Sequence, residues 1–327
     1  MKRNLSWRTF LGLAGMLVPL LFVAYAQAQT FPTKPIRVLI GFPAGSSLDI
    51  VGRALAPHMQ KELGQPIVIE IRTGAAGYLA FNATMNAEPD GHTITYAWPV
   101  GLLPSLVKAN AIDARRDLAP ISDALSSPYV FMTSATLPVR SVQELVAYAK
   151  TKPANTLNFA SSATPLELMM YVAKNATGLT YTVVNYQGGP VIMPALLNGE
   201  ASMHINNFGP FSGQIEAGKI RVLFQTGHQK LALLPDVPSA TDVGIKDLQG
   251  IASDLGYWAP RGTPRAVIDK IQRAVAYAVK QPDVLEMFRK QGYVAVGSTP
   301  EEQLRQYDAS FKFWADAARA ANFVPQQ

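Results

Sequence analysis

The 327-residue chain contains no cysteine, only four histidines, and 16% charged residues. Without cysteine it has neither a disulfide framework nor the acylated cysteine of a lipoprotein anchor. The histidines are widely separated, and none lies three or four residues from another, so no helical metal-binding pair is present. We expect all four to be surface or packing residues, with no metal and no cofactor: His58, His92, His204 and His228.

Several catalytic and nucleic-acid-binding signatures are also missing. The sequence has no G-x-S-x-G, Walker A or G-x-G-x-x-G motif. The net charge is +6, and residues 1–28 supply three of those positive charges, which leaves only +3 beyond them. No lysine-rich or arginine-rich run occurs, so nucleic acid is not an expected partner. We predict that the protein is not an enzyme; a secreted α/β hydrolase that uses Ser46 or Ser161 is the minor alternative.

Residues 1–28 have the pattern of a cleavable secretory signal. Lys2, Arg3 and Arg8 form a basic start, residues 11–25 are apolar, and Ala26-Gln27-Ala28 is a small-x-small cleavage site. The alternative is an uncleaved anchor helix, but the apolar stretch is shorter than the roughly 20 residues that a span needs. The sequence therefore predicts a monomer that is free in the periplasm, starting near residue 29.

The segment from residue 38 to residue 77 carries the strongest pattern. The run Val38-Leu39-Ile40 predicts a buried parallel strand, and apolar residues then recur at helical spacing up to Gly64. Between strand and helix, residues 43–47 place backbone N–H groups and two hydroxyls at a helix N-terminus, where an anion is favoured. The competing interpretation is that Ser46 or Ser47 only caps the helix and that Asp49 stabilises its first turn.

An ordered set of turn motifs extends over residues 31–325. After the PAGSSLD loop come Arg72-Thr73-Gly74-Ala75-Ala76-Gly77, Pro89-Asp90-Gly91, Asp117-Leu118-Ala119-Pro120-Ile121, Tyr186-Gln187-Gly188, Leu234-Pro235-Asp236-Val237-Pro238, Trp258-Ala259-Pro260-Arg261-Gly262 and Gly297-Ser298-Thr299-Pro300. In this order, the set resembles the Bug-type substrate-binding proteins of tripartite tricarboxylate transporters. The resemblance implies a solute-binding protein that works with membrane permease subunits.

Strand and helix patterns alternate along the chain, as in an α/β protein. They include a capped helix from Ser141, a strand at 157–160 and helices at 165–176, 264–279 and 282–290. No linker divides the chain, so two lobes would have to be joined by crossing strands. The resemblance implies a type II periplasmic binding protein fold that crosses near residues 117–133 and returns near 254–260. We expect lobe 1 to comprise 29–127 and 254–327, and lobe 2 to comprise 128–253, with the helix after Thr299 packed on lobe 1.

The resemblance also implies that two loops, one from each lobe, hold a ligand carboxylate. The first loop predicts ligand contacts at Phe42, Pro43, Ala44, Gly45, Ser46, Ser47 and Asp49. Here serines replace the family's usual glycines, and Asp49 is expected to accept N–H groups of the loop rather than to touch an anion, which it would repel. From the second lobe, the candidate contacts are Ser161, Ser162, Thr164, Tyr186, Gln187 and Asn207.

The second loop departs from the family pattern. It is two residues shorter and has no glycine, and Glu167 stands where histidine is frequent. We therefore expect a small carboxylated metabolite whose body is aromatic or otherwise apolar, with Trp98 or Phe208 as further contacts unless they belong to the core. The protein would deliver this ligand to a permease. A ligand-sensing subunit for a signalling partner is the alternative within binding proteins.

Overall fold

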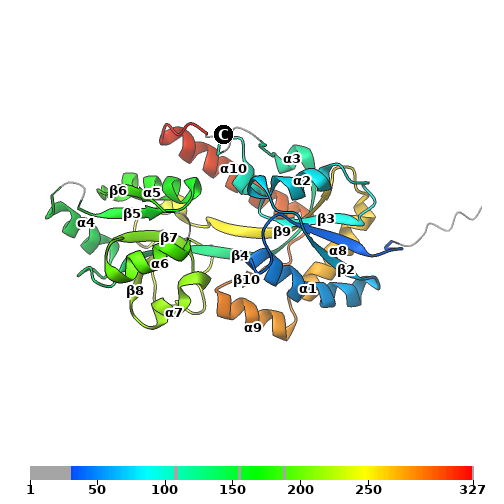
Figure 1. Ribbon diagram of the computed structural model, residues 1–327, viewed down its shortest axis with the longest axis horizontal. Helices are drawn as coiled ribbons and strands as arrows, with labels where there is room; N and C mark the ends of the chain where they lie inside the picture. The colour runs from blue at the N-terminus through cyan, green and yellow to red at the C-terminus, as the bar shows by residue number, and fades with distance from the viewer. Residues whose placement is uncertain (1–30, 107–109, 154–155, 187–188, 326–327) are drawn as a thin grey trace, which may run out of the picture.

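A computed structural model describes residues 31–106, 110–153, 156–186 and 189–325. Figure 1 shows two lobes side by side, with strands passing from one to the other. The predicted leader at 1–28 lies outside the described residues. Within the described part of the chain, no helix is long and apolar enough to span a membrane.

Ten strands form one connected sheet in the order β2-β1-β3-β9-β4-β7-β5-β6, while β8 and β10 also pair with β4. Their bounds are β1 Ile36–Ile40, β2 Ile67–Ile71, β3 Thr93–Ala97, β4 Leu118–Ser134, β5 Asn158–Ser161, β6 Thr182–Asn185, β7 Met203–Asn207, β8 Ile220–Gln225, β9 Ala252–Pro260 and β10 Val294–Ala295. Pairs within β1–β3 and within β5–β7 are parallel, whereas β4 is antiparallel to all four of its neighbours.

The helices cover the two ends of this sheet (Figure 1). Their bounds are α1 Ser47–Leu63, α2 Tyr78–Met85, α3 Ala114–Asp117, α4 Val142–Lys150, α5 Thr164–Thr177, α6 Gly189–Asn198, α7 Ser212–Glu216, α8 Arg265–Ala278, α9 Pro282–Gln291 and α10 Pro300–Ala320. Single 3₁₀ turns occur at Ala75–Gly77, Pro99–Leu102, Gly209–Phe211 and Lys246–Leu248. The α/β alternation predicted from the sequence is therefore confirmed.

The first lobe is built around the β1-α1-β2 unit. Val38 and Ile40 are fully buried, and the apolar stripe of α1 packs against β1, β3 and α8 in one core cluster. Gly64 ends α1 in the left-handed conformation at φ 73°, and its N–H donates to the Gln60 carbonyl. The predicted strand, helix and stop signal are thus all present, which places the loop between β1 and α1 at the carboxyl end of β1.

Two long strands connect the lobes. β4 and β9 run antiparallel with register pairs from Leu118–Pro260 to Pro128–Ala252, interrupted by two irregularities. Beyond that stretch, β4 continues into the second lobe and pairs with β7 and β8. The crossing strands expected near 117–133 and 254–260 are present, and they form the hinge of the two-lobed fold (Figure 1).

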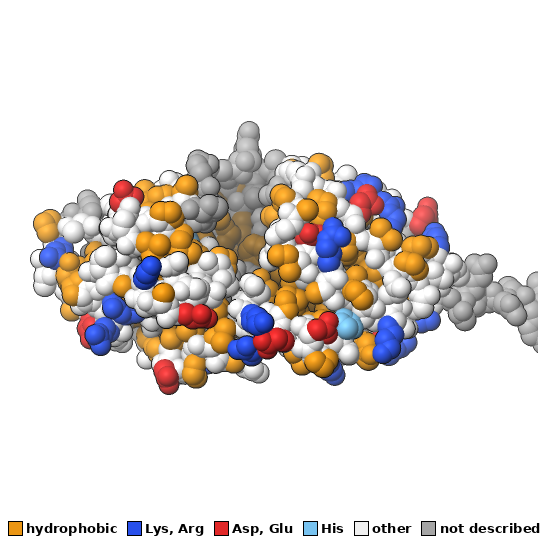
Figure 2. Space-filling view, turned by 60° about the horizontal axis from the view of Figure 1, so that its bottom comes forward, with side chains coloured by type: hydrophobic (Ala, Val, Ile, Leu, Met, Phe, Trp, Pro, Cys, Tyr) orange, Lys and Arg blue, Asp and Glu red, His pale blue; other side chains and the backbone are white. Residues whose placement is uncertain are grey.

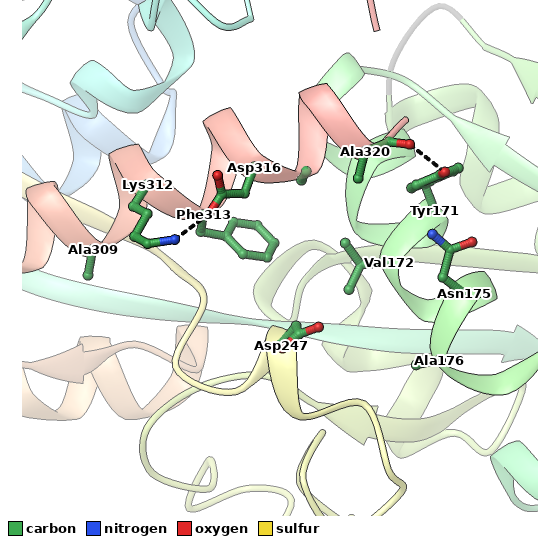
Figure 3. A pocket seen from close by; sticks show the side chains of 11 residues that line it. Tyr171, Val172, Asn175, Ala176, Asp247, Ala309, Lys312, Phe313, Asp316 and Ala320 are labelled. Carbon is green, nitrogen blue, oxygen red and sulfur yellow. Dashed lines mark hydrogen bonds and ion pairs between the residues drawn. The ribbon is translucent and has the colours of Figure 1, made fainter. Parts of the chain in front are cut away.

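The C-terminal helix α10 reaches from the first lobe to the second. Near its start Gln303 donates to the Tyr257 carbonyl of β9, and at its end the Tyr171 hydroxyl of α5 donates to the Ala320 carbonyl at 2.5 Å. Figure 3 shows this last contact, with Phe313 of α10 facing Val172 of α5. The prediction that α10 packs on the first lobe therefore covers only its N-terminal part, because residues of α5 complete the environment of its C-terminal half.

The start of α10 offers a direct test of the capping prediction. The Thr299 hydroxyl accepts from the Glu302 N–H at 3.2 Å, and the Glu302 carboxylate accepts from the Thr299 N–H at 2.8 Å. We expect Thr299→Ala to lower the free energy of unfolding by about 1 kcal/mol, because the Glu302 N–H loses its side-chain acceptor, while the bond from the Thr299 backbone N–H to Glu302 remains possible. Urea denaturation measures the change. Thr299→Ser keeps the acceptor and should be nearly neutral; equal losses in both variants would contradict the capping role.

Candidate ligand-binding site

The predicted contact residues follow parallel strands of each lobe. Residues 42–47 follow β1 and residues 72–77 follow β2. Ser161 is the last residue of β5, residues 162–164 follow it, and Tyr186 follows β6. Because the carboxyl ends of parallel strands meet at one edge, each lobe gathers its loops in one place. Figure 2 shows a hollow between the two lobes, with Lys/Arg and Asp/Glu side chains interspersed on the face in view.

The first loop is braced by Asp49. One carboxylate oxygen accepts from the Gly45 N–H at 2.8 Å, the other accepts from Arg53 Nε at 2.7 Å, and the residue is only 5% exposed. Ser46 caps α1 by accepting from the Asp49 N–H at 3.4 Å. The structure therefore has the helix cap expected at Ser46 and the loop brace expected from Asp49. Because the Gly45 N–H donates to Asp49, it is not free to bind a ligand.

The first turn of α1 keeps free donors. Neither Ser47 nor Leu48 has a hydrogen-bond acceptor for its N–H among the described residues. Ser47 is exposed, and the helix behind these donors runs for 17 residues. Unpartnered N–H groups at the positive end of a helix dipole favour a bound anion. Ser46 therefore acts as a cap, while the next two residues still offer an anion site.

A glycine pair lets two loops approach closely. A Cβ on Gly41 would lie 2.5 Å from the Gly77 Cα, so a side chain there would collide with the turn after β2. The Phe42 ring passes within 3.4 Å of the position that a Gly77 Cβ would take, and Phe42 is 40% exposed. The turn at 72–77 thus supports the first loop, a role that the sequence analysis did not assign to it.

Tyr293 is a neighbour of the site that the sequence analysis missed. It follows α9, and its ring packs edge-on against Phe288 at 5.9 Å between ring centroids. Burial raises the pKa of the Tyr293 phenol, and the Ser47 hydroxyl beside it partly offsets that rise. No local pattern announces this contact, because Tyr293 lies in a distant part of the sequence and reaches Ser47 only through the packing of α9 against the lobe.

The second loop has fewer free groups than the first. Ser161 is fully buried, its hydroxyl donates to Glu167 at 2.7 Å, and its carbonyl accepts from the Tyr186 N–H at 2.8 Å. Ser162 and Thr164 are half-buried. No side chain caps α5, and Pro165 in its first turn has no N–H to donate. The structure brings Ser161 and Tyr186 together, but it engages the Ser161 hydroxyl within the lobe.

The other second-lobe candidates have different surroundings. Asn207 is half-buried, and its side-chain amide donates to the Ser127 carbonyl of β4 at 2.9 Å. Gln187 lies outside the described residues. None of the hydrogen bonds between described residues joins the first loop to the second. All of these ligand contacts therefore stay predictions.

The two aromatic candidates differ in burial. Phe208 is 1% exposed and belongs to the core cluster of the second lobe. Trp98 is half-buried between two core clusters, and its indole N–H has no partner in the described part of the chain. Phe208 is thus a packing residue, while Trp98 at the end of β3 keeps part of its surface.

The histidines do not gather at the site. Burial lowers the pKa of His204 to about 4, and its Nδ1 lies 2.7 Å from the Ala160 carbonyl, so it is a neutral core residue. His58 is half-buried on α1, and its Nε2 lies 2.9 Å from the Asp283 carboxylate. Among the residues that the structure describes, no group of three or more histidine, aspartate or glutamate side chains could hold a metal ion.

A cavity of about 680 Å³ lies elsewhere, between α5 and α10. Figure 3 shows its lining, with Tyr171, Val172 and Asn175 on one side and Lys312, Phe313 and Asp316 on the other. None of the predicted contact residues lines it. This cavity is therefore separate from the loops at the strand ends.

Comparison with known proteins gives one consistent family. The profile described as "Tripartite tricarboxylate transporter family receptor" matches residues 51–312. A curated relative from Cupriavidus necator, the "UPF0065 protein in gbd 5'region", is 35% identical over 282 residues, which is 86% of this chain and 83% of the relative.

Two solved structures have the same fold and similar lengths. The periplasmic binding protein BugD is 25% identical with a TM-score of 0.73, over 90% of this chain and 100% of that one. The R. palustris protein Rpa4515 with adipate is 26% identical with a TM-score of 0.75, over the same shares of the two chains. The resemblance drawn from the turn motifs is thereby confirmed, and so is the two-lobed fold.

Proposed function

The chain belongs to the family of tripartite tricarboxylate transporter receptors, and we propose that it captures a small carboxylate with an apolar or aromatic body for a membrane permease. It is a periplasmic solute-binding protein of this family rather than an enzyme.

The observation that carries the proposal is the braced first loop. Asp49 fixes Gly45 and Ser46, so the N–H groups of Ser47 and Leu48 point out of α1 with no partner among the described residues. Such preorganised donors stabilise a carboxylate without paying to order a loop. A ligand carboxylate at this helix end would also gain from the dipole of α1.

The second lobe favours a ligand that needs few hydrogen-bond donors on the side away from α1. The Ser161 hydroxyl is engaged by Glu167, and Pro165 removes one first-turn N–H, so the loop at 161–164 is a poor carboxylate cradle. Phe42, at 40% exposure, offers apolar surface beside the first loop. A ligand with one carboxylate on the α1 side and an apolar body fits this asymmetry.

Capture would proceed by closure of the two lobes about β4 and β9. We place the lobe boundaries at 29–127 with 254–327 and at 128–253, because the register pairs of β4 and β9 end at Pro128–Ala252. Closure stabilises the complex only if the ligand contacts both lobes better in the closed state. The protein acts as a monomer in this proposal, and the permease recognises the closed form.

Calorimetric titration of the periplasmic form tests the ligand class. The panel contains adipate, citrate, succinate, nicotinate and terephthalate. We expect the acids with an apolar body to bind more tightly, because Phe42 offers them apolar surface. Each further carboxylate that lacks one charged hydrogen bond in the second lobe should cost about 10-fold to 100-fold in affinity, and citrate, with three carboxylates, should suffer most. Submicromolar binding of citrate or succinate, with no response to the aromatic acids, would refute the proposed class.

Gly45→Val tests the docking position. Gly45 adopts φ +82°, and a Cβ there would meet no atom within 4 Å, so the substitution strains the loop and fills the adjoining space without a core collision. We expect ligand binding to be lost while circular dichroism stays native. Gly218→Val, at φ +69° and also with open space around its Cβ, is the matched control and should bind normally. Unchanged affinity in Gly45→Val would move the carboxylate away from this loop.

A further inference from the structure

Two acidic residues lie on the neighbouring strands that cross between the lobes, and both line the same cavity. Asp123 of β4 is 6% exposed, and Asp254 of β9 is half-buried on the neighbouring strand. Both line one cavity of about 370 Å³, together with Ser126, His228 and Gln306. This cavity contains none of the loop residues assigned to the carboxylate site.

Helix α10 holds both carboxyl groups. Gln303 donates to Asp123 at 3.2 Å and Gln306 donates to Asp254 at 3.1 Å, and these glutamines lie three apart on one face of the helix. A Cβ on Gly256 would lie 2.5 Å from the Asp123 carboxylate, so the absence of a side chain there lets this group lie over β9. The acidic pair therefore connects β4, β9 and α10 at the hinge.

Charge compensation is missing around this pair. Among the described residues that line the cavity, none is lysine or arginine, and Glu302 of α10 adds a further carboxylate, which accepts from the Thr299 N–H. His228, from the segment after β8, is the one base among the described residues of this lining. Two ionised carboxylates in such surroundings repel each other strongly.

The other titratable groups that face the pair are phenols. Tyr96 of β3 is near Asp123, and Tyr129 of β4 is near Asp254; burial raises the pKa of both phenols, so they stay neutral. Tyr307 of α10 lines a second, small cavity with both carboxyls, and burial raises the pKa of this phenol as well. Burial also raises the pKa of Asp123, and the neighbouring Asp254 raises it further. For Asp254, burial raises the pKa, while hydrogen bonds from Ser126 and Gln306 and the nearby His228 oppose the rise.

We propose that Asp123 and Asp254 together bind one proton at neutral pH, and that this proton keeps β4, β9 and α10 joined at the hinge between the lobes. The two carboxyls titrate as a coupled pair, so the proton belongs to the pair rather than to one residue. Removing it leaves two like charges between the crossing strands. The hinge is thus tighter in acid and looser in alkali, independently of which ligand the cleft takes.

The direction in which stability changes with pH follows from the linkage between proton binding and folding. A carboxyl whose pKa is higher in the folded than in the unfolded protein contributes stability at low pH, and this stability is lost as the pH rises through the folded pKa. The unfolding midpoint should therefore fall by about 3 °C or more between about pH 5 and about pH 9. In Asp254→Asn, which resembles the protonated acid, the midpoint should be higher at the alkaline end and the fall smaller.

Matched variants separate this pair from other titrations. Asp236→Asn changes an exposed aspartate and should keep the wild-type pH profile. His228→Gln should also keep most of it, which would exclude the histidine as the source. Infrared spectroscopy of the native protein gives a second readout that needs no unfolding transition. At about pH 7 the wild type should show the band of a protonated carboxylic acid, and the double variant Asp123→Asn/Asp254→Asn should lack it.

Either of two results would overturn the proposal. One is the absence of that infrared band in the native protein at about pH 7, or its persistence in the double variant. The other is a pH profile of Asp254→Asn that matches the wild type. Neither result would bear on carboxylate capture at α1, which the calorimetric titrations test separately.

Discussion

Replacing Trp314 with alanine is expected to lower the free energy of unfolding by about 3–5 kcal/mol. Trp314 is 1% exposed on α10 and belongs to the core cluster that contains residues of both lobes. The same cluster contains Phe131 of β4 and Trp258 of β9, so we expect the cavity left by the tryptophan to collapse only in part. Urea denaturation measures the loss, with unfolding monitored by far-ultraviolet circular dichroism because the variant lacks one tryptophan fluorophore.

The neighbouring aromatic residue supplies the control. Phe313 packs edge-on against Trp314 at 4.9 Å between ring centroids but is only half-buried beside the α5–α10 cavity. Phe313→Ala should cost clearly less, because its side chain already faces open space. If Trp314→Ala cost no more than Phe313→Ala, α10 would not be an integral part of the core.

Asp49→Ala is expected to weaken ligand binding about 10-fold or more and to lower the free energy of unfolding by about 1–3 kcal/mol. The substitution removes the acceptor of the Gly45 N–H and the partner of Arg53. The loop at 42–47 then loses its fixed conformation, and the ligand has to order it again on binding. Calorimetry and denaturation on the same preparation measure both effects.

Arg53→Ala separates the two functions of Asp49. The Arg53 side chain is 56% exposed, so its ion pair with Asp49 is worth little, about 0–1 kcal/mol. This variant keeps the Gly45 N–H bond and should bind nearly normally. Full affinity in Asp49→Ala would show that the loop needs no brace, whereas equal losses in both variants would assign the effect to the ion pair.

Local signals in the sequence were enough to predict β1, α1 and the helix cap between them. A short apolar run, a serine cap and Gly64 specify β1, α1 and the end of α1 through contacts within a few residues. The same holds for Thr299 and Glu302, whose reciprocal hydrogen bonds form within one helical turn. Such features need no knowledge of the tertiary fold.

Other features depend on packing between distant segments. The approach of Gly41 to Gly77, the position of Tyr293 beside Ser47 and the contact of α10 with α5 all join residues that have no local relationship. Ser161 is a further example. The sequence predicts a free hydroxyl donor at this position, but in the structure the hydroxyl donates to Glu167. Pattern can place a polar group at a strand end but cannot say which neighbour already uses it.

Amide NMR of the periplasmic form, titrated with the tightest-binding acid of the panel, tests carboxylate capture most directly. We expect the largest shifts at the N–H groups of Ser47 and Leu48, with a second group of shifts at Ser162 and Thr164. Shifts confined to Tyr171, Phe313 and their neighbours in the α5–α10 cavity, with Ser47 and Leu48 unchanged, would contradict it.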